Sequence, residues 1–188
     1  MERIGRSSGV VTDYLLGEVA AHRLAYRTLE DYDWSGNDLA RIAIEDILEK
    51  KEWDKGIGLV GWTGVGKTHL LVALYKERMW RSVYEEAGLP VWLGFSDIIS
   101  LWSEDKEGFI SAIGRGQLIF IDDLFVTGYN ELERAVVRDV VFKCYDTNKL
   151  LCFSSNILIE QADIDVRVKD RLKEMCKFIE VVGESRRK

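Results

Sequence analysis

Short apolar runs alternate with longer segments of helical periodicity along most of the chain. The runs at 56–60, 91–95, 118–121, 150–153 and 178–182 predict five buried strands. The segments at 67–80, 96–102, 106–113, 131–145 and 166–176 predict helices. Because strands that alternate with helices form parallel sheets covered on both faces, we expect an α/β protein with a three-layer αβα sandwich and a five-stranded parallel sheet.

Two further helices are expected before the first strand. The segment from about Thr12 to Tyr32 has an amphipathic pattern, and 37–51 has a clearer one with a single apolar stripe. Ser35, with Asp38 three residues later, resembles the start signal of the second helix. We therefore divide the chain into an N-terminal helical extension, 1–36, and a main domain, 37–188.

One motif carries specific chemistry. Residues 61–68 read G-W-T-G-V-G-K-T, which is a complete phosphate-binding loop between a predicted strand and a predicted helix. Its glycines let consecutive backbone N–H groups point at phosphate oxygens, next to the positive end of the helix. Lys67 is expected to reach the β- and γ-phosphates, and Thr68 is expected to bind Mg²⁺. The nucleotide-binding residues predicted here are Gly61, Thr63, Gly64, Val65, Gly66, Lys67, Thr68 and His69. The alternative is a glycine-rich turn that binds nothing.

Polar residues follow two of the later strands. Asp122 and Asp123 come at the end of the 118–121 run, and Asn156 follows the 150–153 run. Parallel sheets bind ligands at the carboxyl ends of their strands, so these residues should meet the phosphate loop. Asp122 is the expected Mg²⁺ partner, and Asp123 is expected to orient or deprotonate the attacking water. Asn156 could hold that water, although on spacing alone each of the three could also be a turn residue.

Composition narrows the remaining choices. The chain of 188 residues has a net charge of −6, which argues against indiscriminate coating of nucleic acid. No apolar run approaches the length of a membrane span, and we expect a cytoplasmic protein without a membrane partner. Cys144, Cys152 and Cys176 lack metal-ligand spacing and predict three buried, reduced thiols.

The motifs occur in an order and at spacings that resemble one family. They are residues 61–70, the aspartate pair 122–123, Ser-Ser-Asn at 154–156, Arg-Val-Lys-Asp-Arg-Leu at 167–172 and Gly-Glu-Ser-Arg at 183–186. This pattern resembles the AAA+ domain of bacterial and phage DnaC-type helicase loaders and of the related IstB-type transposition ATPases, over about residues 37–186. The resemblance implies binding and Mg²⁺-dependent hydrolysis of ATP.

The resemblance also assigns roles that residue chemistry alone does not. Asn156 becomes the sensor 1 residue. Arg171, with Arg167 as the competing choice, becomes the arginine finger that enters the ATP site of a neighbouring subunit. From the sequence alone, both arginines would be interpreted as surface residues of a charged helix. The resemblance further implies that 95–116 is a helical insertion that contacts single-stranded DNA. Trp102 and Phe109 could stack there on bases beside Lys106, although a core role is favoured for both aromatics.

The expected function is therefore an AAA+ ATPase in DNA replication. It would form a homo-oligomer through ATP-bridged interfaces and place a replicative helicase on single-stranded DNA. The expected architecture has no C-terminal lid domain and too short an N-terminal extension for the usual helicase-binding domain. The alternatives are an IstB-like transposition helper, a small-molecule P-loop kinase, which would need an arginine-rich lid, and a regulatory subunit that binds ATP without hydrolysing it.

Overall fold

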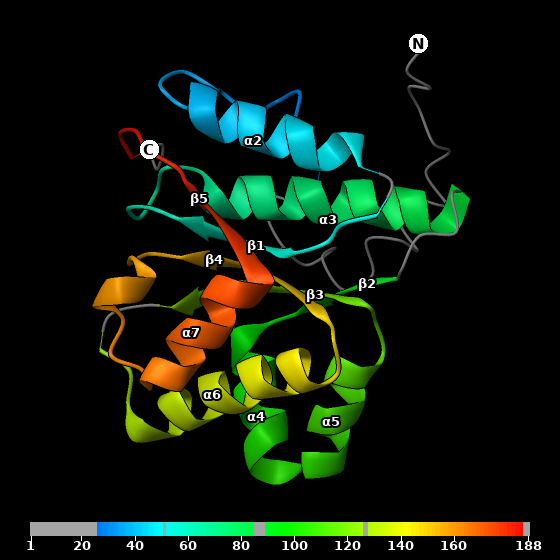
Figure 1. Cartoon of the computed structure of the whole chain (residues 1–188), viewed down its shortest axis with the longest axis vertical. Coiled ribbons are helices and arrows are strands. Elements are labelled where there is room, and N and C mark those ends of the chain that lie inside the picture. Colours follow the sequence, from blue (N-terminus) through cyan, green and yellow to red (C-terminus); the bar gives the residue numbers. More distant parts are fainter. Residues whose placement is uncertain (1–25, 51, 85–88, 126–127, 186–188) are drawn as a thin grey trace.

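Five parallel strands form one sheet in the computed structural model, which describes residues 26–50, 52–84, 89–125 and 128–185 (Figure 1). The strands are β1 (Gly56–Val60), β2 (Pro90–Leu93), β3 (Leu118–Phe125), β4 (Leu150–Ser155) and β5 (Cys176–Glu180). The helices are α2 (Asp38–Glu49), α3 (Lys67–Tyr84), α4 (Phe95–Glu104), α5 (Lys106–Gly114), α6 (Glu131–Asp146) and α7 (Val166–Met175), and a 3-10 turn spans Ile159–Gln161. The order across the sheet is β2-β3-β4-β1-β5.

Helices cover both faces of this sheet, as predicted. α2 and α3 lie on one face, and α4, α5, α6 and α7 lie on the other (Figure 1). The alternation of side chains along β3 explains the two layers of core. Leu118 and Phe120 pack in the cluster under α3, whereas Ile119 and Ile121 pack in the cluster under α6. The inner strand β1 is buried over its whole length and is apolar throughout, whereas the edge strand β5 exposes Lys177 and Glu180.

The strands and helices predicted from residue 37 onward are present, with shifted ends. β3 continues through the half-buried Asp122 and Asp123 to the buried Phe125, and β4 continues to the buried Ser155. β5 begins at Cys176, two residues earlier than predicted. All three cysteines are free and buried, which confirms that prediction. No helix among the residues that the structure describes is long and apolar enough to cross a membrane.

The expected helix at 12–32 is wrong where the structure describes it. Residues 1–25 lie outside the described part, and 26–36 form turns. The Asp31 side chain accepts a hydrogen bond from the backbone N–H of Thr28, and that of Asp33 accepts one from the N–H of Ser35. Such local bonds compete with helix formation. The predicted start signal is also wrong, because Asn37, not Ser35, is the N-cap of α2.

Candidate nucleotide-binding site

The phosphate loop joins the carboxyl end of β1 to the start of α3. Gly64 and Gly66 adopt φ angles of +91° and +106°, which side chains rarely allow. A Cβ atom on Gly64 would also lie 2.3 Å from Ser185 Oγ, and one on Gly66 would lie 2.9 Å from the Tyr32 ring. Both positions therefore require glycine for conformation and for space, as expected of a loop whose N–H groups turn inward.

The loop is supported by residues that the motif does not contain. Tyr32, only 4% exposed, donates a hydrogen bond from its hydroxyl to the Val65 carbonyl at 3.2 Å. Its ring meets the His69 ring edge-on at 5.2 Å, and His69 Nε2 lies 2.7 Å from the Thr28 carbonyl oxygen. His69 therefore contacts the turns at 26–36. The sequence signal for this support is the amphipathic pattern around Tyr32, which predicts a helix, whereas the structure has turns there.

Lys67 is buried inside the loop, with 4% of its surface exposed. Its ammonium group donates hydrogen bonds to the Trp62 carbonyl at 2.8 Å and to Asn156 Oδ1 at 2.7 Å. The Trp62 side chain itself is 83% exposed. The lysine thus connects the phosphate loop to the residue that follows β4, and the structure brings together two residues that are distant in sequence.

Asp122 lies next to Thr68. One of its carboxylate oxygens, Oδ1, accepts hydrogen bonds from Thr68 Oγ1 at 3.1 Å and from Ser154 Oγ at 2.6 Å. A threonine hydroxyl and a carboxylate are oxygen ligands of the kind that Mg²⁺ prefers. Their adjacency at the start of α3 fits the predicted metal position.

Asp123 turns in another direction. Its backbone has φ +52°, in the left-handed region, and its Oδ1 accepts a hydrogen bond from Asn156 Nδ2 at 3.0 Å. Its backbone N–H donates to Ser154 Oγ at 2.8 Å. The two neighbouring aspartates therefore serve different partners, Thr68 for the first and Asn156 for the second. Ser154 bonds to both of them, and no sequence motif singles it out.

Arg167 and Arg171 lie on α7. In the described structure, neither forms a hydrogen bond with the phosphate loop or with the polar residues beside it. The Arg171 guanidinium stacks on the Phe142 ring at 3.6 Å and lies 3.8 Å from Asp146, with 29% of its side chain exposed. The Arg167 side chain is 70% exposed and pairs with Asp165 at 2.7 Å.

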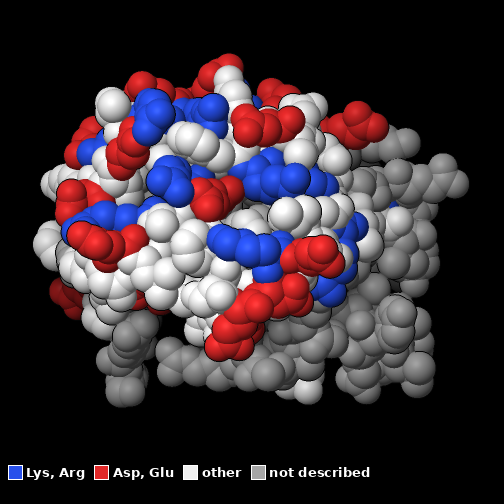
Figure 2. Space-filling model, turned by 90° about the horizontal axis from the view of Figure 1, so that it is seen from below, with Lys and Arg blue, Asp and Glu red and all other residues white. Residues whose placement is uncertain are grey.

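Figure 2 shows the lower face of the molecule, where Lys and Arg side chains intermix with Asp and Glu.

The segment 95–116 forms α4 and α5 and packs on α6. Trp102 Nε1 donates to Asp139 Oδ2 at 2.8 Å, while Lys106 Nζ lies 3.2 Å from the centre of the Trp102 ring. Phe109 is 5% exposed and belongs to the core. The core role that was favoured for the two aromatics is confirmed for Phe109, and Trp102 packs partly buried against the same core.

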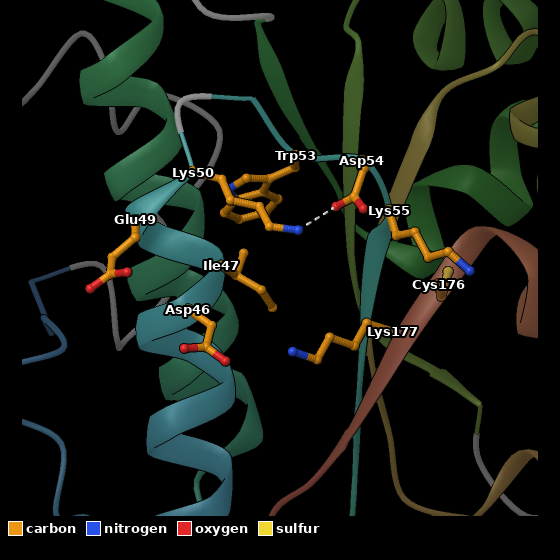
Figure 3. A pocket seen from close by; sticks show the side chains of 9 residues that line it. All are labelled: Asp46, Ile47, Glu49, Lys50, Trp53, Asp54, Lys55, Cys176 and Lys177. Atoms are coloured by element: carbon orange, nitrogen blue, oxygen red, sulfur yellow. Dashed lines mark hydrogen bonds and ion pairs between the residues drawn. The ribbon is translucent and has the colours of Figure 1, made fainter.

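A hollow of about 590 Å³ lies at the opposite edge of the sheet, where β1 and β5 begin (Figure 3). It is lined by Asp46, Ile47, Glu49, Lys50, Trp53, Asp54, Lys55, Cys176 and Lys177. Both lysines and carboxylates line it, and Lys50 pairs with Asp54 at 3.0 Å. This hollow is separate from the phosphate loop, which follows the carboxyl end of β1.

The loop, the paired aspartates and the strand order β2-β3-β4-β1-β5 define a P-loop NTPase of the AAA+ type. The model of the family described as IstB-like ATP binding protein matches residues 15–188, so the chain belongs to that family. The description of this family names ATP as the bound nucleotide.

Several solved structures share this fold. The DnaC helicase loader superposes with a TM-score of 0.68 at 20% identity, covering 86% of this chain and 100% of that one. DnaI superposes with 0.66 at 22% identity, covering 86% and 90%. The initiator DnaA bound to AMPPCP and single-stranded DNA superposes with 0.66 at 22% identity, covering 85% of this chain and 50% of DnaA.

One curated relative, uncharacterized protein YqaM of Bacillus subtilis (strain 168), is 30% identical over 135 residues. The match covers 68% of this chain and 42% of YqaM. The chain thus spans less than half the length of that relative.

Proposed function

We propose that the protein hydrolyses ATP in a Mg²⁺-dependent reaction at the edge formed by the phosphate loop, Asp122, Asp123 and Asn156. The observation that carries the proposal is that the two aspartates bond to different residues. Asp122 bonds to Thr68 and Asp123 bonds to Asn156, although the two residues are adjacent. Hydrolysis needs one carboxylate at the metal and another polar pair at the attacking water, and this edge supplies both.

The donor set fits a magnesium ion. Thr68 Oγ1 and Asp122 Oδ1 lie 3.1 Å apart, and both are hard oxygen ligands. These two residues would hold the ion, directly or through water, and the ion would neutralise charge on the β- and γ-phosphates. Mg²⁺ usually keeps several waters and needs few protein ligands, so two side chains suffice.

The protein residues then have separate tasks. The phosphate loop binds the triphosphate through its backbone N–H groups, and Lys67 neutralises negative charge on it. Asp123 accepts a proton from the attacking water, which Asn156 orients through its amide. Water adds to the γ-phosphorus as the bond to the ADP oxygen breaks, and the products are ADP and inorganic phosphate.

Assembly would complete the site. A guanidinium that enters from a neighbouring copy stabilises the charge of the transition state and makes hydrolysis depend on assembly. Arg171 remains our first choice for this arginine finger, and Arg167 remains the alternative. Arg167 is the more exposed of the two, whereas Arg171 would have to leave the Phe142 ring.

The larger role that we propose is in DNA replication, as a cytoplasmic protein that helps to place a replicative helicase on single-stranded DNA. Support comes from the shared fold of the DnaC helicase loader and of DnaA bound to single-stranded DNA. The family match supports one alternative, a transposition helper of the IstB type. These two roles differ in their protein partner, a helicase in one and a transposase in the other.

The test of the chemistry is phosphate release. Wild-type protein with Mg²⁺ and ATP should release inorganic phosphate, and Asp123→Asn should bind ATP but release phosphate at least about 100-fold more slowly. Asparagine is a suitable replacement because it tolerates the left-handed backbone of this position. Transfer of the phosphate to nucleosides or nucleotides instead of water would show that the protein is a kinase. Binding without turnover would leave only the regulatory subunit.

The test of assembly and partner is native mass. The protein should form larger species with an ATP analogue, and it should bind the replicative helicase of its host when single-stranded DNA is present. Arg171→Ala should lose nucleotide-dependent assembly and hydrolysis, with Arg167→Ala measured beside it. If Arg171→Ala keeps both while Arg167→Ala loses them, the finger is Arg167. Failure to bind the helicase under every condition would exclude the loader role and leave the ATPase intact.

A further inference from the structure

Ser154 lies where β3 leaves regular pairing with β4. The register pairs Ile121 with Phe153 and Phe125 with Ser155, so that three residues of β3, 122–124, lie opposite Ser154 alone. A bulge of this kind bends the strand and redirects side chains, and bulges are frequent beside active sites. Here the bulge contains both aspartates of the proposed ATPase site.

The Ser154 hydroxyl bonds to both residues of the pair. It accepts a hydrogen bond from the Asp123 backbone N–H at 2.8 Å and donates one to Asp122 Oδ1 at 2.6 Å. A hydroxyl has one donor and two acceptor positions, so it can make both bonds at once. Ser154 has no exposed surface. Water therefore cannot easily replace the hydroxyl if the side chain is removed.

The conformation that Ser154 holds is unfavourable without such support. Asp123 has φ +52°, and residues other than glycine enter this region only at a cost unless their surroundings fix them. The same conformation directs the Asp123 carboxylate toward Asn156. The hydrogen bond from the Asp123 N–H to Ser154 thus holds one aspartate in place, and the bond to Asp122 fixes the other beside Thr68.

We propose that Ser154 is a positioning residue for both carboxylates of the site. Its hydroxyl keeps the Asp122 carboxylate at the metal position and the Asp123 carboxylate at the water position. The inference rests on the proposed ATPase function, but it concerns a side chain whose two hydrogen bonds go to the aspartate pair. Ser154 acts through the aspartates, so its loss should affect turnover and Mg²⁺ dependence more than nucleotide binding.

The sharpest experiment compares Ser154→Thr with Ser154→Val, because the two side chains have the same shape and differ in the hydroxyl. The threonine variant should stay within a few-fold of wild-type kcat, whereas the valine variant should lose about 10- to 100-fold in kcat and need a higher Mg²⁺ concentration, as is usual when a residue supporting metal ligands is removed. The dissociation constant of an ATP analogue measured without Mg²⁺ should be equal for both.

A second measurement does not depend on turnover. In nucleotide-free protein, the amide proton of Asp123 should exchange with solvent faster in Ser154→Val than in Ser154→Thr, because its acceptor is missing. Ser82→Ala removes a hydroxyl that bonds to Met79 near the far end of α3, and it should change neither exchange at Asp123 nor kcat.

The outcomes separate the two proposals. Absence of hydrolysis by wild-type protein would reject the ATPase, and the amide exchange of Asp123 would still decide the role of Ser154. If wild-type protein hydrolyses ATP and the threonine and valine variants have equal kcat, equal Mg²⁺ dependence and equal exchange, Ser154 is not a positioning residue. If the valine variant unfolds, Ser154→Ala replaces it in the same comparison.

Discussion

Replacing Asn156 with aspartate tests the central geometry of the site by adding one charge without changing the shape of the side chain. In the structure Asn156 Oδ1 accepts from Lys67 at 2.7 Å, and its amide donates to Asp123 at 3.0 Å. Asn156→Asp turns the first contact into an ion pair and the second into a contact between two carboxylates. The variant therefore strengthens the attraction to Lys67 and replaces the hydrogen bond to Asp123 with a repulsion.

The two changes nearly cancel without nucleotide. At an effective dielectric constant of about 20, the new attraction to Lys67 across the 2.7 Å contact is about 6 kcal/mol, and the repulsion from Asp123 across the 3.0 Å contact is similar, about 5.5 kcal/mol. The fold should therefore tolerate the substitution, and the melting temperature should stay within a few degrees of the wild-type value.

ATP removes that balance. Lys67 must turn to the phosphates, which leaves the new carboxylate facing Asp123 and the negative triphosphate. Even if solvent screens half of the repulsion, about 3 kcal/mol remains, which corresponds to about 100-fold weaker binding. We expect Asn156→Asp to bind Mg²⁺-ATP at least about 100-fold more weakly than the wild type, whereas Asn156→Ala should bind within about tenfold and fail mainly in turnover.

Calorimetric titration with a non-hydrolysable ATP analogue measures the affinities, and circular dichroism measures the melting temperatures. Asn148→Asp is the matched control because it adds the same charge at an exposed residue, whose positive φ of +51° aspartate tolerates as asparagine does. It should bind nucleotide as the wild type does. Wild-type affinity in Asn156→Asp, with an unchanged melting temperature, would refute the reasoning that Lys67 exchanges Asn156 for the phosphates.

Three other predictions concern stability and reactivity. Tyr32→Phe should lower the free energy of unfolding by about 1 kcal/mol and the melting temperature by about 2–4 °C, because the buried Tyr32 hydroxyl bonds to the phosphate loop. Tyr26→Phe, at an exposed position, should change neither quantity. Burial raises the pKa of Cys144 to about 12, so a thiol reagent at pH 8 should label it only as fast as the protein unfolds, and rapid labelling of native protein would contradict this. The hydrogen bonds from Arg167 lower the pKa of Asp165 to about 2, below its ordinary 3.8, so this carboxylate stabilises the fold above pH 3.8 and loses that effect as the pH falls toward 2. Urea unfolding of Asp165→Asn should therefore differ from wild type at pH 7 and converge with it at pH 2, and a constant difference would contradict the assignment.

Local patterns were sufficient to predict most of the fold. β1, β2, β3 and β4 were predictable because each contains an apolar run that is almost entirely buried, whereas β5 is an edge strand that exposes Lys177 and Glu180. The phosphate loop was predictable because its function needs glycines and a lysine at fixed spacing within one short segment. Placing Asp122 near Thr68 needed one further rule, that the carboxyl ends of parallel strands meet at one edge.

The remaining features depend on contacts that no local pattern encodes. The bulge opposite Ser154 is set by the register between β3 and β4, whose residues are about thirty positions apart in sequence. The turns around Tyr32 have an apolar pattern that is compatible with a helix, and packing against His69 favours another conformation. The sequence predicts a surface position for Arg171, whereas in the structure its guanidinium stacks on the Phe142 ring of α6.

Segments that precede and follow the core of the domain in sequence both contact the phosphate loop. Asn37 joins them directly, because its side chain exchanges two hydrogen bonds of 2.8 Å with the backbone of Val182. Tyr32 bonds to the loop from one segment, and Ser185 lies against Gly64 from the other. If nucleotide binding at the loop stabilises these segments, anything that orders or displaces them changes nucleotide affinity by the same coupling free energy. A partner that contacts 26–37 or 181–185 could thus control the ATP site without touching it.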